Sequence, residues 1–272
     1  MIISRLLTPI GPRWALDEKF LPESFTLNQL LDLPAHLQAD LLNSLVTNEP
    51  ARGDILAPIE EHQEVWASGV TFLRSRQARE AESATGDIYQ RVYLAERPEL
   101  FYKSCGWRVI NPKGNIRIRS DSRWNVPEPE LVLVLNRLGE ICGYCAGNDV
   151  SSRDIEGENP LYLPQAKVYN GSCALGPKIV LETNTHIMNN LPIRLDIFHE
   201  GSTVYSGETS TQMMKRSYED LASYLFKELS FPTGVFLMTG TGIVPPETFS
   251  LQTGDTVKVS IGEQVLENTT VS

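Results

Sequence analysis

The chain has 272 residues, of which 41% are hydrophobic and 21% charged, a composition typical of a globular protein with a substantial core. Its formal net charge of -10 argues against nucleic acid or an anionic membrane surface as a partner, because neither would be attracted by the mean field. The longest aliphatic run, residues 131–135, is too short to cross a bilayer, and the first residues do not resemble a signal peptide, so we expect a cytoplasmic protein with no membrane contact.

The first 60 residues differ in composition from the rest. Residues 27–45 carry many leucines at helical spacing, interrupted or bounded by Pro22, Pro34 and Pro50. This pattern predicts several short helices in a small N-terminal lobe. The composition changes near residues 57–61, so we expect a lobe over residues 1–60 and a larger domain over residues 61–272.

A polar segment follows at residues 74–84. Its alanine, arginine and glutamate residues favour a helix by propensity but offer almost no apolar stripe, so such a helix must be solvated or face a polar cavity. Residues 87–93 are expected to continue as helix and to end before Pro98.

The central part of the chain reads as short strands separated by turns. We expect strands at residues 116–119, 131–135, 141–146 and 179–181, with residues 136–140 forming a hairpin loop that contains Gly139. Residues 193–198 alternate apolar and polar side chains, as a strand with one solvated face does.

One long helix is predicted after these strands. Its apolar residues recur at spacings of four, three, four and four between Met214 and Leu229, Ser210 or Thr211 could cap it, and Pro232 would stop it. This pattern predicts a helix over residues 211–229. Residues 235–238 and 256–259 are predicted as closing strands.

The four cysteines, Cys105, Cys142, Cys145 and Cys173, are too few for a disulfide scaffold at this length. Cys142 and Cys145 match a C-x-x-C pattern, which raises a redox or zinc site as an alternative. In a regular strand, residues three apart face opposite sides and could not share one ion. We therefore interpret these cysteines as reduced core thiols.

Three carboxylates indicate a metal site. Glu128 and Glu130 lie two residues apart at the start of an apolar run, so an extended chain points both the same way. Asp149 ends the next apolar segment. Carboxylates without histidine favour a hard divalent cation.

Several short motifs occur in an order and spacing that resemble the fumarylacetoacetate hydrolase family over about residues 66–272. They are the segments 98–103 (PELFYK), 128–131 (EPEL), 143–154 (GYCAGNDVSSRD), 175–177 (LGP), 239–242 (TGTG) and 254–255 (GD), together with Lys167. Residues 96–101 and 154–167 resemble a narrower branch of that family, the 2-keto-3-deoxy-pentonate dehydratases.

The resemblance implies an α+β fold whose catalytic domain is a β-rich rolled mixed sheet, assembled as a homodimer. It also implies Mg²⁺, with Mn²⁺ or Ca²⁺ as substitutes, held by Glu128, Glu130 and Asp149. Magnesium takes oxygen ligands and keeps several waters, so three carboxylates leave positions at which a 2-oxo acid could chelate the metal.

For a 2-keto-3-deoxy-pentonate the implied chemistry is loss of water. Polarisation of the C2 keto group would acidify the C3 hydrogens and stabilise an enolate, after which the C4 hydroxyl could leave. The expected product, after tautomerisation, is 2,5-dioxopentanoate, whether the pentonate is arabinonate or xylonate. The configuration at C4 is not determined by the sequence.

The resemblance also suggests roles for individual residues. Lys167 lies where the family keeps an active-site lysine, and we favour a clamp on the enolate over a Schiff base. Thr241 resembles a residue that binds the substrate carboxylate. Arg153 is expected to orient Asp149 or the neighbouring loop.

One departure from the family affects the expected reaction. Hydrolytic members carry an Asn-Tyr-x-x-His-x-x-Glu pattern whose histidine and glutamate activate water, whereas Ser75 and Ala78 stand at those two positions here. This favours dehydration over hydrolysis of a carbon-carbon bond.

The acid and base for the reaction remain open at this point. Glu96 and Glu99 are candidates because they lie close to or within the first motif, and Ser75 or Arg76 could bind substrate hydroxyls. No histidine falls in a matched motif. A hydrolase, decarboxylase or isomerase of a 2-oxo or diketo acid stays as the alternative within the family. A ligand-binding module without catalysis is the alternative of another class.

Overall fold

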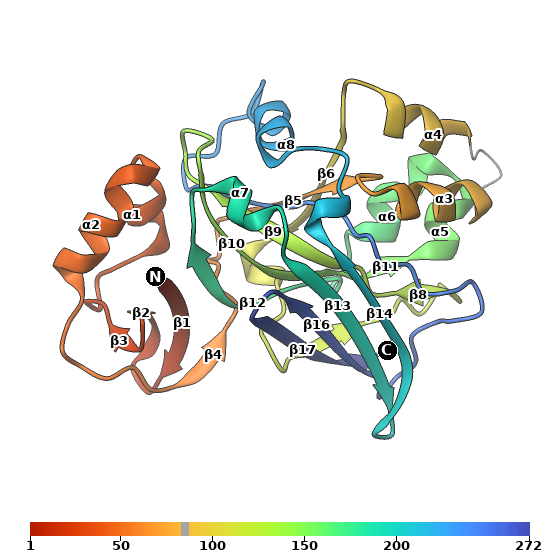
Figure 1. The fold of residues 1–272 in the computed structure, drawn as a ribbon. Coiled ribbons are helices and arrows are strands. Elements are labelled where there is room, and N and C mark those ends of the chain that lie inside the picture. The colour runs from red at the N-terminus through yellow and green to blue at the C-terminus, as the bar shows by residue number, and fades with distance from the viewer. Residues whose placement is uncertain (83–86) are drawn as a thin grey trace.

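A computed structural model of the chain describes residues 1–82 and 87–272. Its centre is a ten-stranded mixed sheet in the order β3-β2-β1-β12-β10-β9-β15-β5-β6, with β4 paired to β1 (Figure 1). A second sheet of five strands, in the order β14-β13-β16-β17-β7, packs against it. These sheets confirm the β-rich mixed architecture expected from the sequence.

The part of the large sheet formed by residues 64–238 contains both parallel and antiparallel pairs. Strand β15 pairs parallel with β5 and antiparallel with β9, and β9 and β10 form the predicted hairpin. The strands of this part are β5 (Glu64–Gly69), β6 (Glu99–Cys105), β9 (Pro129–Leu135), β10 (Ile141–Asp149), β12 (Cys173–Leu181) and β15 (Val235–Met238).

Strand β9 lies between two cores, which explains its continuous apolar sequence. Leu131, Leu133 and Leu135 face the five-stranded sheet, whereas Val132 and Val134 face the N-terminal helices. The five-stranded sheet contains β7 (Asn115–Arg117), β13 (Pro192–His199), β14 (Ser202–Ser210), β16 (Thr256–Ile261) and β17 (Gln264–Val271). Strands β8 (Asn125–Val126) and β11 (Ser151–Ser152) form a separate pair.

The first 60 residues contain the predicted short helices together with four strands. They are β1 (Ile2–Thr8), β2 (Gly11–Leu16), β3 (Lys19–Phe20), α1 (Leu27–Leu31), α2 (Ala35–Leu45) and β4 (Asp54–Leu56). Strand β1 pairs antiparallel with β12, so this segment extends the large sheet. A domain division at residue 60 stays a prediction.

Helices gather at the opposite end of the molecule from the N-terminal segment (Figure 1). They are α3 (Leu73–Glu82), α4 (Asp87–Leu94), α5 (Arg153–Glu158) and α6 (Leu163–Lys167), with a 3-10 turn at Pro160–Tyr162. The predicted helix over residues 74–84 thus corresponds to α3, and its last two positions, Ser83 and Ala84, lie outside the described residues. No helix in the described ranges is long and apolar enough to cross a membrane.

The predicted helix over residues 211–229 is wrong in its extent. The segment starts with a 3-10 turn, Thr211–Met213, and the helix proper, α8 (Tyr218–Leu225), begins after the Ser217 cap. Between them Lys215 donates its backbone N–H to the carbonyl of Thr71 at 2.9 Å, and Met214 forms a β-bridge with Phe72. This pairing with a distant segment excludes a helix there. Two other short elements are the 3-10 turn Gly106–Arg108 and α7 (Thr185–Met188).

The expected orientation of Cys142 and Cys145 is also wrong. Both side chains are buried in the same core, because a β-bulge at Cys142 interrupts the alternation of β10. Their interpretation as unreactive thiols remains: burial raises the pKa of Cys142 to about 12 and raises that of Cys145 as well. All four cysteines are free thiols that form no disulfide.

Candidate metal and catalytic site

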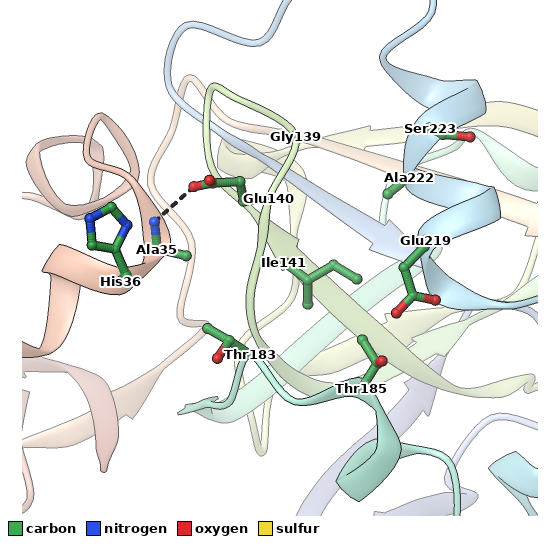
Figure 2. Close-up of a pocket in the computed structure, with 10 residues that line it drawn as sticks. All are labelled: Ala35, His36, Gly139, Glu140, Ile141, Thr183, Thr185, Glu219, Ala222 and Ser223. Carbon is green, nitrogen blue, oxygen red and sulfur yellow. Dashed lines mark hydrogen bonds between the residues drawn. The ribbon is translucent and has the colours of Figure 1, made fainter.

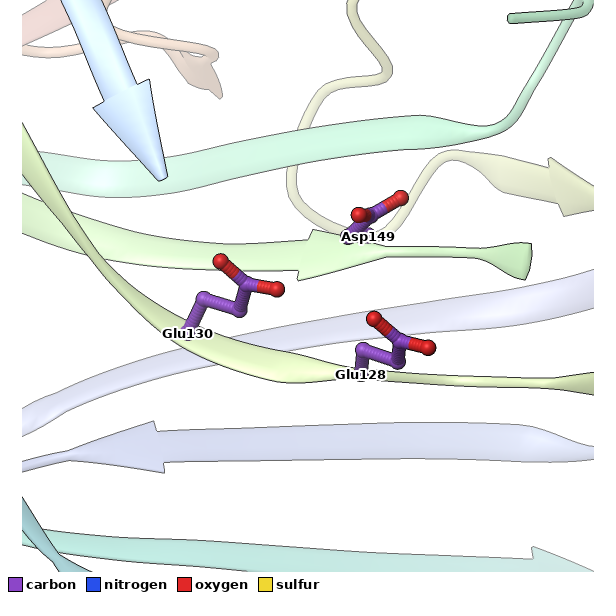
Figure 3. Close-up of side chains that lie close together, drawn as sticks. All are labelled: Glu128, Glu130 and Asp149. Carbon is purple, nitrogen blue, oxygen red and sulfur yellow. The ribbon is translucent and has the colours of Figure 1, made fainter. Parts of the chain in front are cut away.

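Three carboxylates converge where β9 begins and β10 ends. Glu128 immediately precedes β9, Glu130 lies within it, and Asp149 closes β10. Antiparallel pairing sets Glu130 opposite Gly147, which brings Asp149 beside Glu128. One ligand oxygen from each of the three lies within 4.8 Å of the others (Figure 3). The predicted sharing of one cation by Glu128 and Glu130 is therefore geometrically feasible.

These carboxylates are buried, with exposures of 3%, 1% and 1% for Glu128, Glu130 and Asp149. Burial raises the pKa of Glu130 well above its ordinary value, and the charges of Asp149 and Glu128 raise it further. Three buried anions in one place need positive charge nearby. An oxygen-only donor set with this spacing fits a divalent cation such as Mg²⁺.

Lys167 supplies one positive charge from the end of α6. Its Nζ atom lies 2.8 Å from Glu128 Oε2, 3.0 Å from Asp149 Oδ2 and 2.7 Å from Ser151 Oγ. The short helix that carries it follows the 3-10 turn of the motif at residues 154–167. That motif therefore delivers the lysine to the carboxylates.

Arg153 supplies another, from the first residue of α5. Its Nη2 atom donates to Glu128 Oε1 at 2.9 Å, and its Nη1 atom donates to Glu156 at 3.3 Å. The sequence predicted contact with Asp149 or the adjoining loop. The side chain instead orients Glu128, because α5 begins beside the strand pair that leads into β9.

Lys103, on β6, was not identified from the sequence as a site residue. It is fully buried, its ammonium group contacts the carboxylate of Asp149, and it donates to the carbonyl oxygen of Val150 at 3.1 Å. Its place in the motif at residues 98–103 was the available signal. A fully buried lysine requires an anionic partner.

Glu99 lies at the start of the same strand and lines the cavity beside the carboxylates. It pairs with Gly69 of β5, and its carboxylate crosses the space where a side chain at residue 69 would be. A Cβ atom added to Gly69 would lie 2.0 Å from Glu99 Oε2. Glycine at residue 69 is therefore needed for this position of Glu99.

A further carboxylate, Glu156, also lines the cavity and is 5% exposed. It lies in the dehydratase-like motif, but no feature of the sequence distinguishes it from its acidic neighbours Asp154 and Glu158. The distinguishing feature is helical geometry, because residue 156 is three positions after Arg153 and faces the same side of α5.

Ser75 and Thr241, both predicted to bind substrate, line the cavity. The Ser75 hydroxyl donates to the carbonyl of Phe72 at 2.9 Å, and that of Thr241 donates to the carbonyl of Ile243 at 3.2 Å. Between β15 and Thr241, the backbone N–H of Gly240 donates to Glu130 Oε2 at 2.6 Å. The TGTG motif thus contacts a proposed metal ligand through its backbone.

Two predicted site residues are not brought to the cavity. Glu96 is exposed and accepts a hydrogen bond from the Tyr224 hydroxyl at 3.3 Å, on the surface near α8. Arg76 points along α3, 3.5 Å from Glu80 and over the ring of Tyr93. Of the two acid/base candidates, the structure brings only Glu99 to the carboxylates.

The cavity itself is narrow, with about 20 Å³ of free space, which is room for about one water molecule. A molecule larger than water could enter only if side chains around the carboxylates moved apart. Val70, which lines the cavity, has a φ of 54°, a strained value for a β-branched residue. Such strain often occurs at functional sites.

A larger cavity, of about 470 Å³, lies elsewhere, between α2, the β9–β10 hairpin and α8 (Figure 2). Its charged lining is Glu140, Glu219 and His36, and Glu140 already accepts a hydrogen bond from the backbone N–H of Ala35 at 2.8 Å. Among the described residues, the carboxylates that lie close enough together to share one metal ion are Glu128, Glu130 and Asp149, which line the smaller cavity. We therefore place the candidate site at Glu128, Glu130 and Asp149.

Comparisons with known proteins place the chain in a family. A probable 2-keto-3-deoxyxylonate dehydratase of Haloferax volcanii is 48% identical over 199 residues, which are 73% of this chain and 68% of the relative. A 2-dehydro-3-deoxy-D-arabinonate dehydratase of Saccharolobus solfataricus is 41% identical over 211 residues, which are 76% of this chain and 70% of that protein.

A solved structure of similar fold is a 2-keto-3-deoxy-D-arabinonate dehydratase complexed with magnesium and 2,5-dioxopentanoate. It has a TM-score of 0.80 and 32% identity, and the match covers 99% of this chain and 98% of that one. The family of fumarylacetoacetate (FAA) hydrolase C-terminal domains matches residues 65–271. The chain thus belongs to the fumarylacetoacetate hydrolase family.

Proposed function

We propose that the chain is a Mg²⁺-dependent dehydratase that converts a 2-keto-3-deoxy-pentonate into 2,5-dioxopentanoate. The observation that carries this proposal is the buried group of Glu128, Glu130 and Asp149, with Lys167 and Glu99 at the same cavity. The names of the two relatives above 40% identity, and the magnesium and product in the similar structure, support the same reaction.

When bound, the metal would act as a Lewis acid on the keto group of a 2-oxo acid. Glu128, Glu130 and Asp149 would hold it, and Arg153 keeps Glu128 oriented through its 2.9 Å contact. The Gly240 N–H fixes one oxygen of Glu130. The chain's own contribution at this step is a rigid, water-poor set of ligands.

Glu99 is the proposed base that removes a proton from C3. It lines the cavity, unlike Glu96, and its carboxylate is held over Gly69. Lys167 is proposed to stabilise the enolate as an ammonium ion. Its contacts with Glu128 and Asp149 favour the charged form, whereas a Schiff base requires the neutral amine.

The proposed reaction removes one water from the 2-keto-3-deoxy-pentonate and rearranges the remaining atoms. Loss of the C3 proton and of the C4 hydroxyl forms a C3–C4 double bond and one water. A proton then moves from C5 to C3, giving a C4–C5 enol, and tautomerisation of this enol places a second hydrogen on C4 and leaves an aldehyde at C5. We propose that Ser75, Thr241 and Glu156, which line the cavity, contact the substrate's carboxylate or hydroxyl groups.

The names of the two relatives, one a xylonate and one an arabinonate enzyme, do not imply two different substrates. D-xylonate and D-arabinonate differ only at C2 and C3, and both of these stereocentres are lost in the 2-keto-3-deoxy form. The two D-acids therefore give the same molecule. What remains open is the configuration at C4, hence D or L.

The deciding experiment offers the purified protein the D and L forms of 2-keto-3-deoxy-pentonate and, separately, a 2,4-diketo acid. Each reaction is run with Mg²⁺ and with EDTA, and 2,5-dioxopentanoate is measured by trapping its aldehyde with a hydrazine. We expect product from one pentonate, only with Mg²⁺. Cleavage of the diketo acid without product from either pentonate would reject the dehydratase in favour of the hydrolase.

We also propose that the protein works as a homodimer in the cytoplasm, in the breakdown of a pentose. The lobe over residues 1–60 and the catalytic domain over residues 61–272 are part of this proposal. Size-exclusion chromatography with light scattering should give about twice the 30.4 kDa mass of the chain. A single-chain mass would contradict the dimer and leave the proposed reaction unaffected.

A further inference from the structure

Lys103 occupies an irregular position in strand β6. Val65 of β5 pairs with Ser104, and the next residue, Trp66, pairs with Tyr102, so Lys103 has no partner on β5. It is the extra residue of a β-bulge. Bulges often redirect a side chain near an active site.

The Lys103 side chain points toward Asp149 and toward the backbone of Lys167. Its ammonium group contacts Asp149 Oδ1, while Lys167 Nζ lies 3.0 Å from the other oxygen, Oδ2. The same ammonium donates to the carbonyl oxygens of Val150 and Lys167. One buried cation therefore connects the carboxylate of Asp149, the backbone after it and the backbone of Lys167.

A purely structural role explains this arrangement poorly. Lys103 is fully buried, and burying a charged pair costs a desolvation energy that a well-packed apolar side chain would avoid. Asp149 is also already paired with Lys167. A second lysine on the same carboxylate therefore indicates that the position of Asp149 has to be held closely.

We propose that Lys103 is a positioning residue of the metal site. It fixes Asp149 by one oxygen and leaves the other on the side of Lys167 and Glu128. It also sets the distance between Asp149 and Lys167 by donating to the carbonyl oxygens of Val150, the residue after Asp149, and of Lys167. The inference rests on the proposed function in that it requires Glu128, Glu130 and Asp149 to bind a divalent cation.

The substitution Lys103→Met separates a positioning role of Lys103 from a simple effect of its charge, because the two predict opposite changes in metal affinity. Lys103→Met removes a positive charge near a cation site, so Coulomb forces alone would tighten metal binding. Loss of positioning would weaken it instead. We expect the dissociation constant for Mn²⁺, measured on metal-free protein by electron paramagnetic resonance, to rise at least tenfold, with a changed spectrum of the bound ion.

Two further variants complete the test. Lys103→Arg keeps the charge, but its planar guanidinium group cannot contact the same three oxygen atoms in the same geometry, so it should also weaken Mn²⁺ binding. Ser104→Ala is the matched control, because Ser104 is the next residue of β6, is 1% exposed and donates to the carbonyl of Cys105, away from the carboxylates. It should bind Mn²⁺ like the wild type.

Thermal unfolding in EDTA checks that each variant is folded, and Lys103→Gln replaces Lys103→Met if the latter is not. Equal or tighter Mn²⁺ binding by a folded Met or Gln variant would overturn the inference. Wild-type protein that binds Mn²⁺ but converts no pentonate would overturn the proposed reaction and leave this role of Lys103 standing. Wild-type protein that binds no Mn²⁺ would overturn both.

Discussion

The two cavities differ in size and in the way that their carboxylates are held. The cavity at α2 and α8 has about 470 Å³ of free space, whereas the one at Glu128, Glu130 and Asp149 has about 20 Å³. In the larger one, Glu140 is held by a backbone N–H and an asparagine amide. In the smaller one, carboxylates are held by Lys103, Lys167 and Arg153. The proposed metal site is thus in the smaller of these two cavities.

The pKa values of Glu130 and Glu140 are shifted in opposite directions in the two cavities. Burial raises the pKa of Glu130, with two neighbouring carboxylates adding to the effect. Hydrogen bonds from Ala35 and Asn136 lower the pKa of Glu140, which is exposed. A carboxylate whose charged form is disfavoured gains most from an added cation. The raised pKa of Glu130 therefore favours the smaller cavity as the place where a cation would bind.

The largest effect is expected from Glu130→Gln, which removes a proposed ligand while keeping the size of the side chain. Turnover of the pentonate should fall below detection, and Mg²⁺ should no longer raise the melting temperature. The turnover is measured as formation of 2,5-dioxopentanoate, and the melting temperature is measured by calorimetry with and without Mg²⁺. Full activity of this variant in metal-defined buffer would remove Glu130 from the site and weaken the contrast between the cavities.

The same variant should be more stable than the wild type in EDTA at neutral pH. Because the folded-state pKa of Glu130 is raised, its contribution to stability is present below the unfolded-state pKa of about 4.3 and is lost as the pH rises through the folded value. The gain from Gln should thus grow with pH. Each kcal/mol corresponds to roughly 2–4 °C in melting temperature. Equal melting curves from pH 5 to pH 8 would contradict a raised pKa of Glu130 in the folded protein.

A pair of matched substitutions tests the proposed base. Glu99→Gln should lower kcat by about 100-fold or more, the usual contribution of a general base. Glu96→Gln makes the same chemical change three residues earlier, on an exposed side chain at Tyr224, and should leave kcat unchanged. Mn²⁺ binding should be retained by both. Equal losses, or a loss confined to Glu96, would reassign the base.

A smaller effect is expected from Gly69→Ala. The added methyl group would occupy the position of the Glu99 carboxylate, which must then move away. Misplacement of a catalytic group by a fraction of an ångström should reduce kcat by about tenfold, less than removal of the group. The φ of Gly69 is not in the left-handed region, so alanine adds no backbone strain. Unchanged kcat would mean that Glu99 acts from another position.

The sequence predicted the proposed metal ligands better than their surroundings. Glu128 and Glu130 could be paired from strand alternation alone, and the motif order supplied Asp149 and Lys167. Lys103 could not be assigned, because its role depends on a bulge opposite Val65 and on a contact with a residue 46 positions away. Interactions between distant segments are not visible in a local pattern.

The errors have the same origin. The helix predicted over residues 211–229 had the correct apolar spacing, but pairing of Lys215 with Thr71 takes its first part into a bridge. Cys142 and Cys145 share a core because a bulge interrupts the alternation that separates them. Glu96 and Glu99 are close in sequence, yet only Glu99 lies on the strand that reaches the cavity.

The smallest effect is expected in the larger cavity. Glu140→Ala removes the acceptor for the first N–H group of α2, whose N-cap, Pro34, offers no side-chain bond. Loss of such a cap costs about 0.5–1 kcal/mol, reduced by solvent at this exposed position. Turnover should be unchanged, in contrast to every substitution in the smaller cavity.

The pH dependence of this stability loss has the opposite sign to that of Glu130. The folded-state pKa of Glu140 is lowered, so its contribution is present above the unfolded-state pKa and is lost as the pH falls through the folded value. Urea unfolding at pH 7 should separate Glu140→Ala from the wild type, and the separation should shrink toward pH 3.5. A loss of turnover in this variant would instead make the larger cavity part of the catalytic machinery and remove the distinction between the two.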